Sequence, residues 1–357
     1  MHGRRPSFRQ VTLSLGLLVA LAAWMLGLAA PLHAQNAVAE GGGRPAPFVF
    51  DAAHAADSAR TDGETNPPVR KRIFKPYRFW GGLGGFALAD GATMYGLGKL
   101  WYGAQGQTSF AWYSERLRTR YKNAPDDGWL DDWHTYAQQD KGGHFVVAWH
   151  LARVFGEYGR WTGLSQRQAG LFGGTMSALF QSQIEVFDGF AVEYGASRTD
   201  VLANFLGGAI GGLQVAYPEL NWFTTKYSYH RSPYYDVTSG YVGNALKDYD
   251  GISCWLVVRP ERLLSEKAAR WWPGWLAVSA GYSGTGLAHP ISGRTATGGL
   301  GGPVHQRQFF LSLDVDWLAT TDLPQPYRTV ARFFSFVRIP FPALELGART
   351  RWHWLYY

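Results

Sequence analysis

Apolar and polar positions alternate with a helical period through the middle of the chain. Three apolar stretches, at about 140–156, 165–187 and 199–216, each carry polar or ionisable side chains three or four residues apart. Residues at that spacing lie on one face of a helix, so the pattern predicts three helices that each bear a polar stripe. The glycines between Gly207 and Gly212 are expected to let another helix approach closely.

An earlier stretch, residues 79–102, is apolar and rich in glycine, with Asp90 and Lys99 as its charged residues. Its length is sufficient for a helix that crosses a bilayer. A carboxylate near the centre of such a span is costly, because hydrocarbon does not solvate charge. A helix buried in a bundle is therefore an equal alternative for this stretch.

The pattern changes from about Tyr227 onward, where apolar and polar residues alternate with a period close to two. This alternation is clearest in residues 275–282, 308–317 and 351–357, and Gly, Pro and Ser residues separate these segments. Such runs are typical of antiparallel strands. The sequence therefore predicts an α+β fold: a helical bundle with a polar intrahelical cluster, followed by an antiparallel β-rich C-terminal region.

The N-terminus has the features of a secretory signal. A basic start is followed by an uncharged apolar run over residues 11–30 and by small residues that predict cleavage after Ala34. An uncleaved membrane anchor is the alternative. No cysteine follows the run, so the signal is not of the lipoprotein type. The expected organisation is a signal peptide at 1–34, a flexible linker at 35–71, a helical domain at 72–217 and a β-rich region at 218–357.

The amino-acid composition indicates the environment in which the protein is expected to function. The chain contains 16 Trp, 19 Tyr and 21 Phe, which together form 16% of its residues. Aromatic rings concentrate at membrane interfaces, so this content favours membrane association. The net charge of +7 is scattered, which in an exported protein argues against a nucleic-acid partner. Cys254 is the single cysteine and is expected to be a small buried hydrophobe rather than a catalytic thiol.

The polar stripes of the three central helices contain the candidate chemistry. Isolated charges between apolar helices are costly unless they are paired or bind a metal. His144, Glu185 and Asp188 are the candidate catalytic residues and also the candidate ligands of a divalent metal such as zinc or manganese. The candidate binding residues are Asp140, Lys141, Asp200 and Asn204. The alternative is a hydrogen-bonded and ion-paired network that fixes the register of the helices.

An acidic loop precedes these helices, at residues 123–135. Its carboxylates lack the alternating ligand spacing of a calcium-binding loop. We therefore expect a solvated loop and helix cap. The carboxylates concerned are those of Asp126, Asp127, Asp131 and Asp132.

These residues together resemble the YfiM-like domain family. The resemblance rests on an Asp-Lys-x-x-His-Phe opening at Asp140, a Glu-x-x-Asp pair at Glu185, and a Ser-x-x-Asp-x-x-x-Asn ending at Ser197 ahead of a Gly-rich helix. It extends over roughly residues 75–357, in the longer, Bacteroidetes-type version of the family, and is weaker towards VanZ-like membrane proteins. The resemblance implies a predicted periplasmic or outer-membrane (lipo)protein with no established activity.

Two functions from different classes follow. The first is an exported, membrane-associated protein of the cell envelope that is structural or binds a lipid or other ligand. Its expected place is the outer membrane or the periplasmic face of the envelope, and its expected partner is membrane lipid or another envelope component. The second is a metal-dependent or acid/base hydrolase that acts on an envelope lipid or glycan through the polar cluster.

Overall fold

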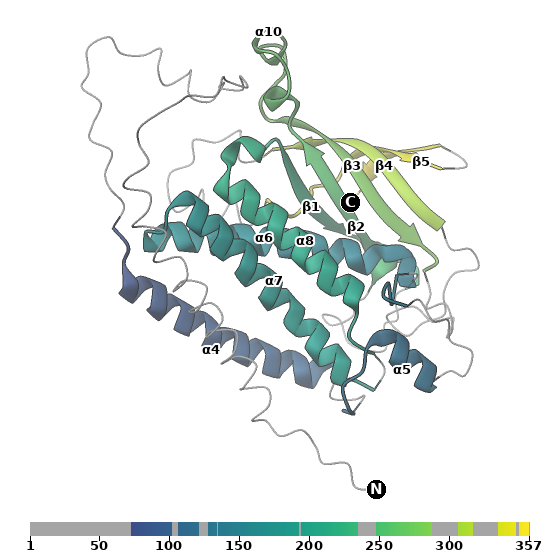
Figure 1. The fold of residues 1–357 in the computed structure, drawn as a ribbon. Helices are drawn as coiled ribbons and strands as arrows, with labels where there is room; N and C mark the ends of the chain where they lie inside the picture. Colours follow the sequence, from purple (N-terminus) through teal and green to yellow (C-terminus); the bar gives the residue numbers. More distant parts are fainter. Residues whose placement is uncertain are drawn as a thin grey trace, which may run out of the picture.

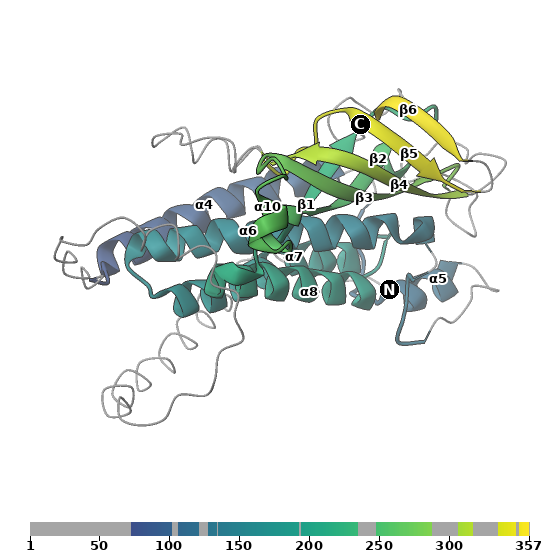
Figure 2. The same cartoon turned by 90° about the horizontal axis from the view of Figure 1, so that it is seen from above.

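The computed structural model describes residues 73–101, 106–120, 128–133, 135–192, 194–234, 248–287, 306–316, 335–347 and 350–356. The expected signal peptide and the expected linker both lie outside this part of the chain. Helices form one layer and a single sheet forms the other, which confirms the predicted α+β class (Figures 1 and 2).

Helices occupy the first part of the described chain. Three of them, α6, α7 and α8, pack against one another, and α4 lies beside α6 (Figure 1). The three central helices are thus confirmed, and α6 continues past its predicted end near residue 156. The bounds are α4 (Pro76–Trp101), α5 (Tyr113–Arg120), α6 (Gln139–Thr162), α7 (Gln166–Phe190) and α8 (Arg198–Ala216), with short 3-10 helices η1 (Thr135–Gln138) and η2 (Pro218–Leu220).

Capping residues fix where these helices begin and end. Ser165 starts α7 with a capping box, in which its hydroxyl accepts from the backbone N–H of Gln168 and the Gln168 side chain accepts from the Ser165 N–H. Gly163 ends α6 with a left-handed backbone (φ 102°), which glycine adopts without strain. Of the two candidate caps that the sequence offers for α8, Ser197 and Thr199, it is the Ser197 hydroxyl that accepts from the backbone N–H of Asp200, at 3.1 Å.

Small residues bring the three central helices unusually close together. A side chain at Gly207 would place its Cβ 2.3 Å from the carbonyl oxygen of Phe145 on α6. At Gly173 the corresponding Cβ would lie 2.2 Å from the carbonyl oxygen of Ala152. Both distances are far below van der Waals contact, so these positions require glycine, as the sequence predicted for the Gly-rich helix.

The outer helix α4 packs on this trio through its aromatic side chains. Phe79 and Leu83 are buried in a cluster that includes Phe155 and Phe172. Burial raises the pKa of the Asp90 carboxyl, which lies near the middle of α4. In the described part of the chain, none of the helices combines the length and apolarity needed to span a bilayer. The structure thus shows α4 packed on the central helices through one side, with Phe79 and Leu83 buried there.

All six strands form one antiparallel sheet in sequence order, β1 to β6. The three predicted strands are present as β3, β4 and β6. The bounds are β1 (Phe223–Tyr229), β2 (Ile252–Val258), β3 (Leu276–Thr285), β4 (Gln306–Val315), β5 (Phe341–Leu346) and β6 (Arg351–Tyr356), with short helices η4 (Tyr249–Gly251), η5 (Pro260–Arg262) and α10 (Glu266–Ala269) between strands.

Residues 336–338, which lie outside the strands, contact both edge strands of the sheet, β1 and β6. The backbone N–H of Tyr227 in β1 donates to Phe336 O at 2.7 Å, and Tyr227 O accepts from the N–H of Arg338 at 2.9 Å. The Arg338 guanidinium in turn donates to the carbonyl oxygen of Tyr356 in β6, at 2.8 Å. The side chains on one face of the sheet, among them Trp255, Phe310 and Asp314, are buried, and we call this the inner face.

The inner face combines aromatic packing with buried charge. Trp255, Phe310 and Tyr356 form its apolar centre. Beside them, Lys226 Nζ donates to Asp314 Oδ1 at 2.6 Å. The inner face also buries hydroxyl side chains along the strands: Ser228, Ser253, Ser279, Ser283 and Ser312.

The opposite, outer face carries the apolar rows. Residues paired in register across five neighbouring strands form one such row: Leu256, Ala280, Leu311, Leu344 and Trp352. Near β1 and β2 the helix α6 covers this face, where Gly142 lies against Cys254. Burial raises the pKa of the Cys254 thiol to about 12, in keeping with the expected role as a small hydrophobe.

His150 joins α6 to β1 and provides a test of this packing. Its Nε2 lies 2.9 Å from Thr225 O, and burial lowers the pKa of the ring to about 3. Because this value lies below the ordinary 6.5, only the unfolded chain gains a proton as the pH falls below about 6.5. We expect wild type to lose up to about 1.4 kcal/mol of unfolding free energy per pH unit there, relative to His150→Gln. Urea unfolding near pH 7 and pH 5 measures this, and equal pH dependence of the two proteins would contradict it.

Candidate functional site

Buried polar and ionisable residues, together with the partly buried His144, gather where α6 and α8 begin and α7 nears its end. We call this set the ionic cluster. Its members come from three helices and from the turn before η1: Asp132, Asp140, Lys141, His144, Glu185, Asp200 and Asn204.

The start of α8 positions the carboxylates of two helices. The Ser197 hydroxyl caps the N–H of Asp200, which places that residue in the first helical turn. The backbone N–H of Ser197 donates to Glu185 Oε2 at 2.8 Å. Asn204 follows Asp200 by one turn on the same face. The local sequence of α8 thus brings its own polar stripe against Glu185 of α7.

In the acidic turn before η1 the carboxylates of Asp131 and Asp132 are buried, so the expectation of solvated carboxylates is wrong for these two residues. Asp131 is 0% exposed, accepts from the backbone N–H of Arg198 at 2.9 Å and pairs with its guanidinium at 3.1 Å. The Thr199 hydroxyl donates to Asp131 O at 2.7 Å. These bonds hold Asp132 over α6, with a left-handed backbone (φ 63°). Asp126 and Asp127 lie outside the described residues.

Lys141 occupies one half of the ionic cluster. Its Nζ lies 2.5 Å from Asp132 Oδ2, 2.8 Å from Asp140 Oδ2 and 3.1 Å from Asp200 Oδ1. Burial alone would lower the pKa of this ammonium, but the three carboxylates outweigh it and hold the pKa well above its usual range. Lys141 therefore stays charged.

The three carboxylates around Lys141 differ in the direction in which their pKa values are shifted. Burial raises the pKa of Asp132 to about 6 and raises that of Asp140 as well. Burial acts in the same direction on Asp200, but Lys141 and His144 together lower the pKa of Asp200 below its usual value. Asp200, which touches both halves of the cluster, is therefore the most firmly ionised of the three.

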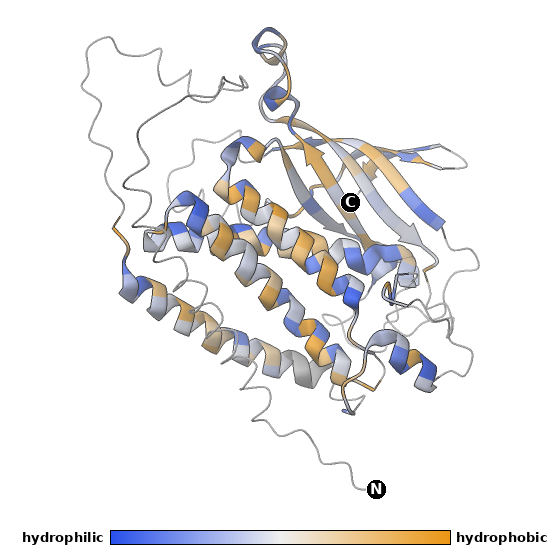
Figure 3. Cartoon of the chain, viewed as in Figure 1, coloured by the Kyte–Doolittle hydropathy of each residue, from blue (hydrophilic) through white to orange (hydrophobic). Residues whose placement is uncertain are grey.

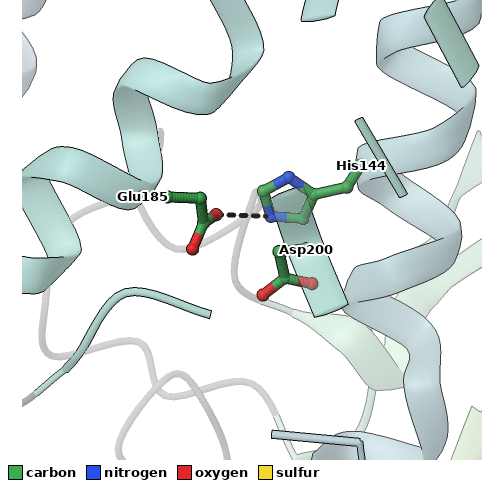
Figure 4. A group of neighbouring side chains, drawn as sticks. All are labelled: His144, Glu185 and Asp200. Carbon is green, nitrogen blue, oxygen red and sulfur yellow. Dashed lines mark ion pairs between the residues drawn. The ribbon is translucent and has the colours of Figure 1, made fainter. Parts of the chain in front are cut away.

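His144 occupies the other half, with Glu185 and Asp200 (Figure 4). Its Nδ1 lies 3.0 Å from Asn204 Oδ1, and its Nε2 lies 3.6 Å from Glu185 Oε1. One side-chain ligand atom from each of His144, Glu185 and Asp200 lies within 4.8 Å of the other two. Burial raises the pKa of Glu185, and the nearby Asp200 and Asp188 carboxylates raise it further.

The structure brings together six of the seven residues that the sequence selected. Asp188 is the exception: it is half-buried, one turn beyond Glu185, and belongs to neither of the two candidate metal groups found in the described chain. Those groups are His144, Glu185 and Asp200, and Asp132, Asp140 and Asp200. The geometry thus places Asp200 where the sequence expected Asp188, and the catalytic role of Asp188 stays a prediction.

Sequence reasoning missed Asp131 and Asp132 as members of this region. The available signal was their position a few residues before the Asp140–Lys141 pair, since a buried lysine needs compensating carboxylates. Chemically, the assembled cluster offers carboxylate oxygens and an imidazole nitrogen, which are ligands for a divalent metal, and a histidine–carboxylate pair suited to proton transfer.

Comparison with protein families gives the domain a name. Residues 126–216 match the family described as "Predicted periplasmic lipoprotein (DUF2279)". This part of the chain is similar to the YfiM-like, DUF2279 family. The matched range contains α6, α7, α8 and every residue of the ionic cluster, and is narrower than the resemblance over residues 75–357. No curated protein and no solved structure matches the chain.

Proposed function

We propose that this DUF2279 protein is exported to the cell envelope and associates there with membrane lipid through the outer face of its sheet. The observation that carries the proposal is the polarity of the sheet. Its enclosed inner face holds Lys226, Asp314 and Arg338, whereas its outer face is apolar. Water as the only solvent favours the opposite arrangement, with charges outside and apolar side chains inside.

Exposure of the outer face supports lipid as its partner. From Phe309 to Val315 in β4, every outward side chain is apolar, and Leu311 is 47% exposed. Trp352 and Trp354 of β6 lie on the same face with ring centroids 5.6 Å apart, and Trp354 is 77% exposed. A contiguous apolar patch with tryptophans at its margin fits the boundary between hydrocarbon and headgroups. Figure 3 shows an orange stretch along β4.

Helix α8 provides a competing apolar surface, with Leu202, Phe205 and Leu206 exposed. The exposed apolar residues of α8 lie on one helix, whereas those of the sheet extend across several strands and end at Trp352 and Trp354. The sheet is therefore the better candidate for lipid contact. The expected location is the outer membrane or the periplasmic face of the envelope, in line with the family description.

The test is fractionation of the chain expressed with its own leader in a bacterium that has two membranes. We expect wild type to stay in the outer-membrane pellet after a high-salt wash. The double variant Leu311→Lys/Trp354→Lys should shift towards the soluble fraction, by about tenfold for each apolar side chain replaced. Both positions are exposed, so their replacement leaves the core intact.

Leu206→Lys on α8 is the matched control, since Leu206 is 49% exposed. It should stay in the pellet. Release by Leu206→Lys, with retention of the double variant, would move the lipid contact to α8. Release of wild type into the high-salt wash would contradict membrane association through either surface.

A metal-dependent or acid/base hydrolase acting on an envelope lipid or glycan is the second candidate. The observation that favours it is the contact between His144 and Glu185 in a buried cluster of carboxylates. Such chemistry first requires that the cluster bind a cation or move a proton. The first of these requirements can be tested without knowing a substrate.

A further inference from the structure

We propose that His144, Glu185 and Asp200 bind one divalent transition-metal cation of the zinc or manganese type. The ligands are Nε2 of the imidazole and one carboxylate oxygen from each of the other two. This proposal concerns the helical layer and is independent of the lipid contact of the sheet.

Buried carboxylate oxygens at this place favour a bound cation. Glu185 is 3% exposed and Asp200 is 5% exposed. Glu185 Oε1 and Asp200 Oδ1 each lack a hydrogen-bond partner among the described residues, although Asp200 Oδ1 lies at ion-pair distance from Lys141. Leaving buried carboxylate oxygens without a partner is costly, and coordination to a cation removes that cost.

The protonation of His144 favours a metal at Nε2. Asn204 Oδ1 accepts a hydrogen bond, so Nδ1 of the ring carries the proton. In the neutral ring, Nε2 then keeps its lone pair and faces Glu185 Oε1. A metal-bound histidine usually donates its other N–H to an oxygen acceptor in the same way. Asn204 is therefore a positioning residue rather than a ligand.

The spacing of the ligand atoms fits a single ion. In a tetrahedral zinc site, with bonds of about 2.0–2.1 Å, neighbouring ligand atoms are roughly 3.3 Å apart. The separation of 3.6 Å between His144 Nε2 and Glu185 Oε1 is close to this value. Asp200 belongs to the same group within 4.8 Å, so a small inward movement of its carboxylate completes the set.

Charge distinguishes the two candidate groups of the cluster. The group of Asp132, Asp140 and Asp200 already contains a cation, the Lys141 ammonium. The group of His144, Glu185 and Asp200 has no lysine or arginine among its members. With its four carboxylates ionised and Lys141 charged, the cluster has a net charge of −3, and one divalent cation reduces this to −1. An imidazole ligand favours zinc or manganese over calcium or magnesium, which prefer oxygen ligands alone.

The experiment is metal titration of the purified full-length protein after removal of bound metal with a chelator. ZnCl₂ and MnCl₂ are added separately, and binding is measured by calorimetry and by elemental analysis. We expect about one equivalent of metal in wild type, together with a rise in Tm when metal is added. The variants His144→Gln and Glu185→Gln should each lose affinity by at least about a hundredfold.

Asp188→Asn is the matched control, because it removes a carboxylate one turn from Glu185 but outside the proposed ligand set. It should bind metal as wild type does. Glu185→Gln keeps the size of the side chain, so it tests the ligand without opening a cavity.

Three outcomes would overturn the proposal. One is that wild type binds neither metal. Another is that both Gln variants bind as tightly as wild type, which would place the metal elsewhere. The third is loss of binding in Asp188→Asn, which would exchange Asp200 for Asp188 in the ligand set.

Discussion

Replacement of Lys141 by methionine is expected to destabilise the protein by about 3–5 kcal/mol at neutral pH, because it leaves buried carboxylates without their cation. The Lys141 ammonium lies within 3.1 Å of oxygens from Asp132, Asp140 and Asp200. Methionine has a similar length and no charge, so the loss is electrostatic rather than steric. Urea unfolding of the two proteins measures the difference in unfolding free energy.

The pH dependence of this effect provides a second readout. The folded pKa of Asp132, about 6, lies above its ordinary value of 3.8. Between these two pKa values the folded state holds a proton that the unfolded chain has lost. The contribution of this carboxyl to the unfolding free energy therefore falls as the pH rises from about 3.8 to about 6. Without Lys141 the folded pKa values rise further. The penalty of Lys141→Met should thus be largest near neutral pH and shrink as the pH is lowered towards about 4.

Lys267→Met, in the exposed helix α10, is the matched control for the loss of a positive charge. It should change the unfolding free energy by less than about 0.5 kcal/mol. A penalty for Lys141→Met that is equally small, or that does not change with pH, would mean that Lys141 does not compensate the carboxylates as the distances indicate.

Gly173→Ala is expected to destabilise the protein by at least about 3 kcal/mol. A Cβ at this position would lie 2.2 Å from Ala152 O and 2.7 Å from Gly156 N. Both atoms belong to the backbone of α6, which cannot turn aside as a side chain can. The two helices must therefore separate, and their shared packing loosens along its length. Thermal unfolding followed by circular dichroism measures the effect.

Gly84→Ala makes the same chemical change on α4, where a Cβ would meet no atom within 4 Å. Alanine is the better helix former, so this variant should gain about 0.5–1 kcal/mol. Opposite signs for the two variants would show that contact between α6 and α7, rather than helix propensity, decides the cost. A stabilising Gly173→Ala would contradict the close approach.

The central helices and most of the ionic cluster were predictable because their signals are local. His144 lies one turn after Asp140, and Asn204 lies one turn after Asp200, so each pair shares a face. Buried polar side chains on an apolar helix need hydrogen-bond or ion-pair partners. The polar side chains that are closest in the sequence lie on the next helices of the same bundle. This reasoning assembles, from the sequence alone, Asp140, Lys141, His144, Glu185, Asp200 and Asn204.

The members that were misjudged depend on contacts distant in the sequence. Asp132 joins the cluster because Asp131 is held by Arg198 and Thr199 of α8, which no spacing within the acidic loop encodes. Asp188 was selected because it lies three residues after Glu185. Asp188 thus lies one turn further along α7 and is not part of the group. The third member, with His144 and Glu185, is Asp200 at the start of α8.

The sheet was predictable in its strands and not in its two faces. Alternation along β3 and β4 located both strands, but a period of two does not say which side is enclosed. The inner face is defined by residues 336–338, a segment without a recognisable strand pattern that bonds to β1. The buried charges of Lys226 and Asp314 are consequently found on the side where alternation alone would have placed solvent.

The hydrogen bonds between Tyr227 and residues 336–338 also set an order of events during synthesis of the chain. Strands β1 to β6 pair with neighbours in sequence, so each can join as it emerges. The second edge of β1, by contrast, waits for a segment that follows more than a hundred residues later. Until that segment arrives, the edge presents open backbone groups and the charges beside it face water. A chain interrupted before residue 336 would lack these bonds to β1 and would leave that edge open to pairing with another strand.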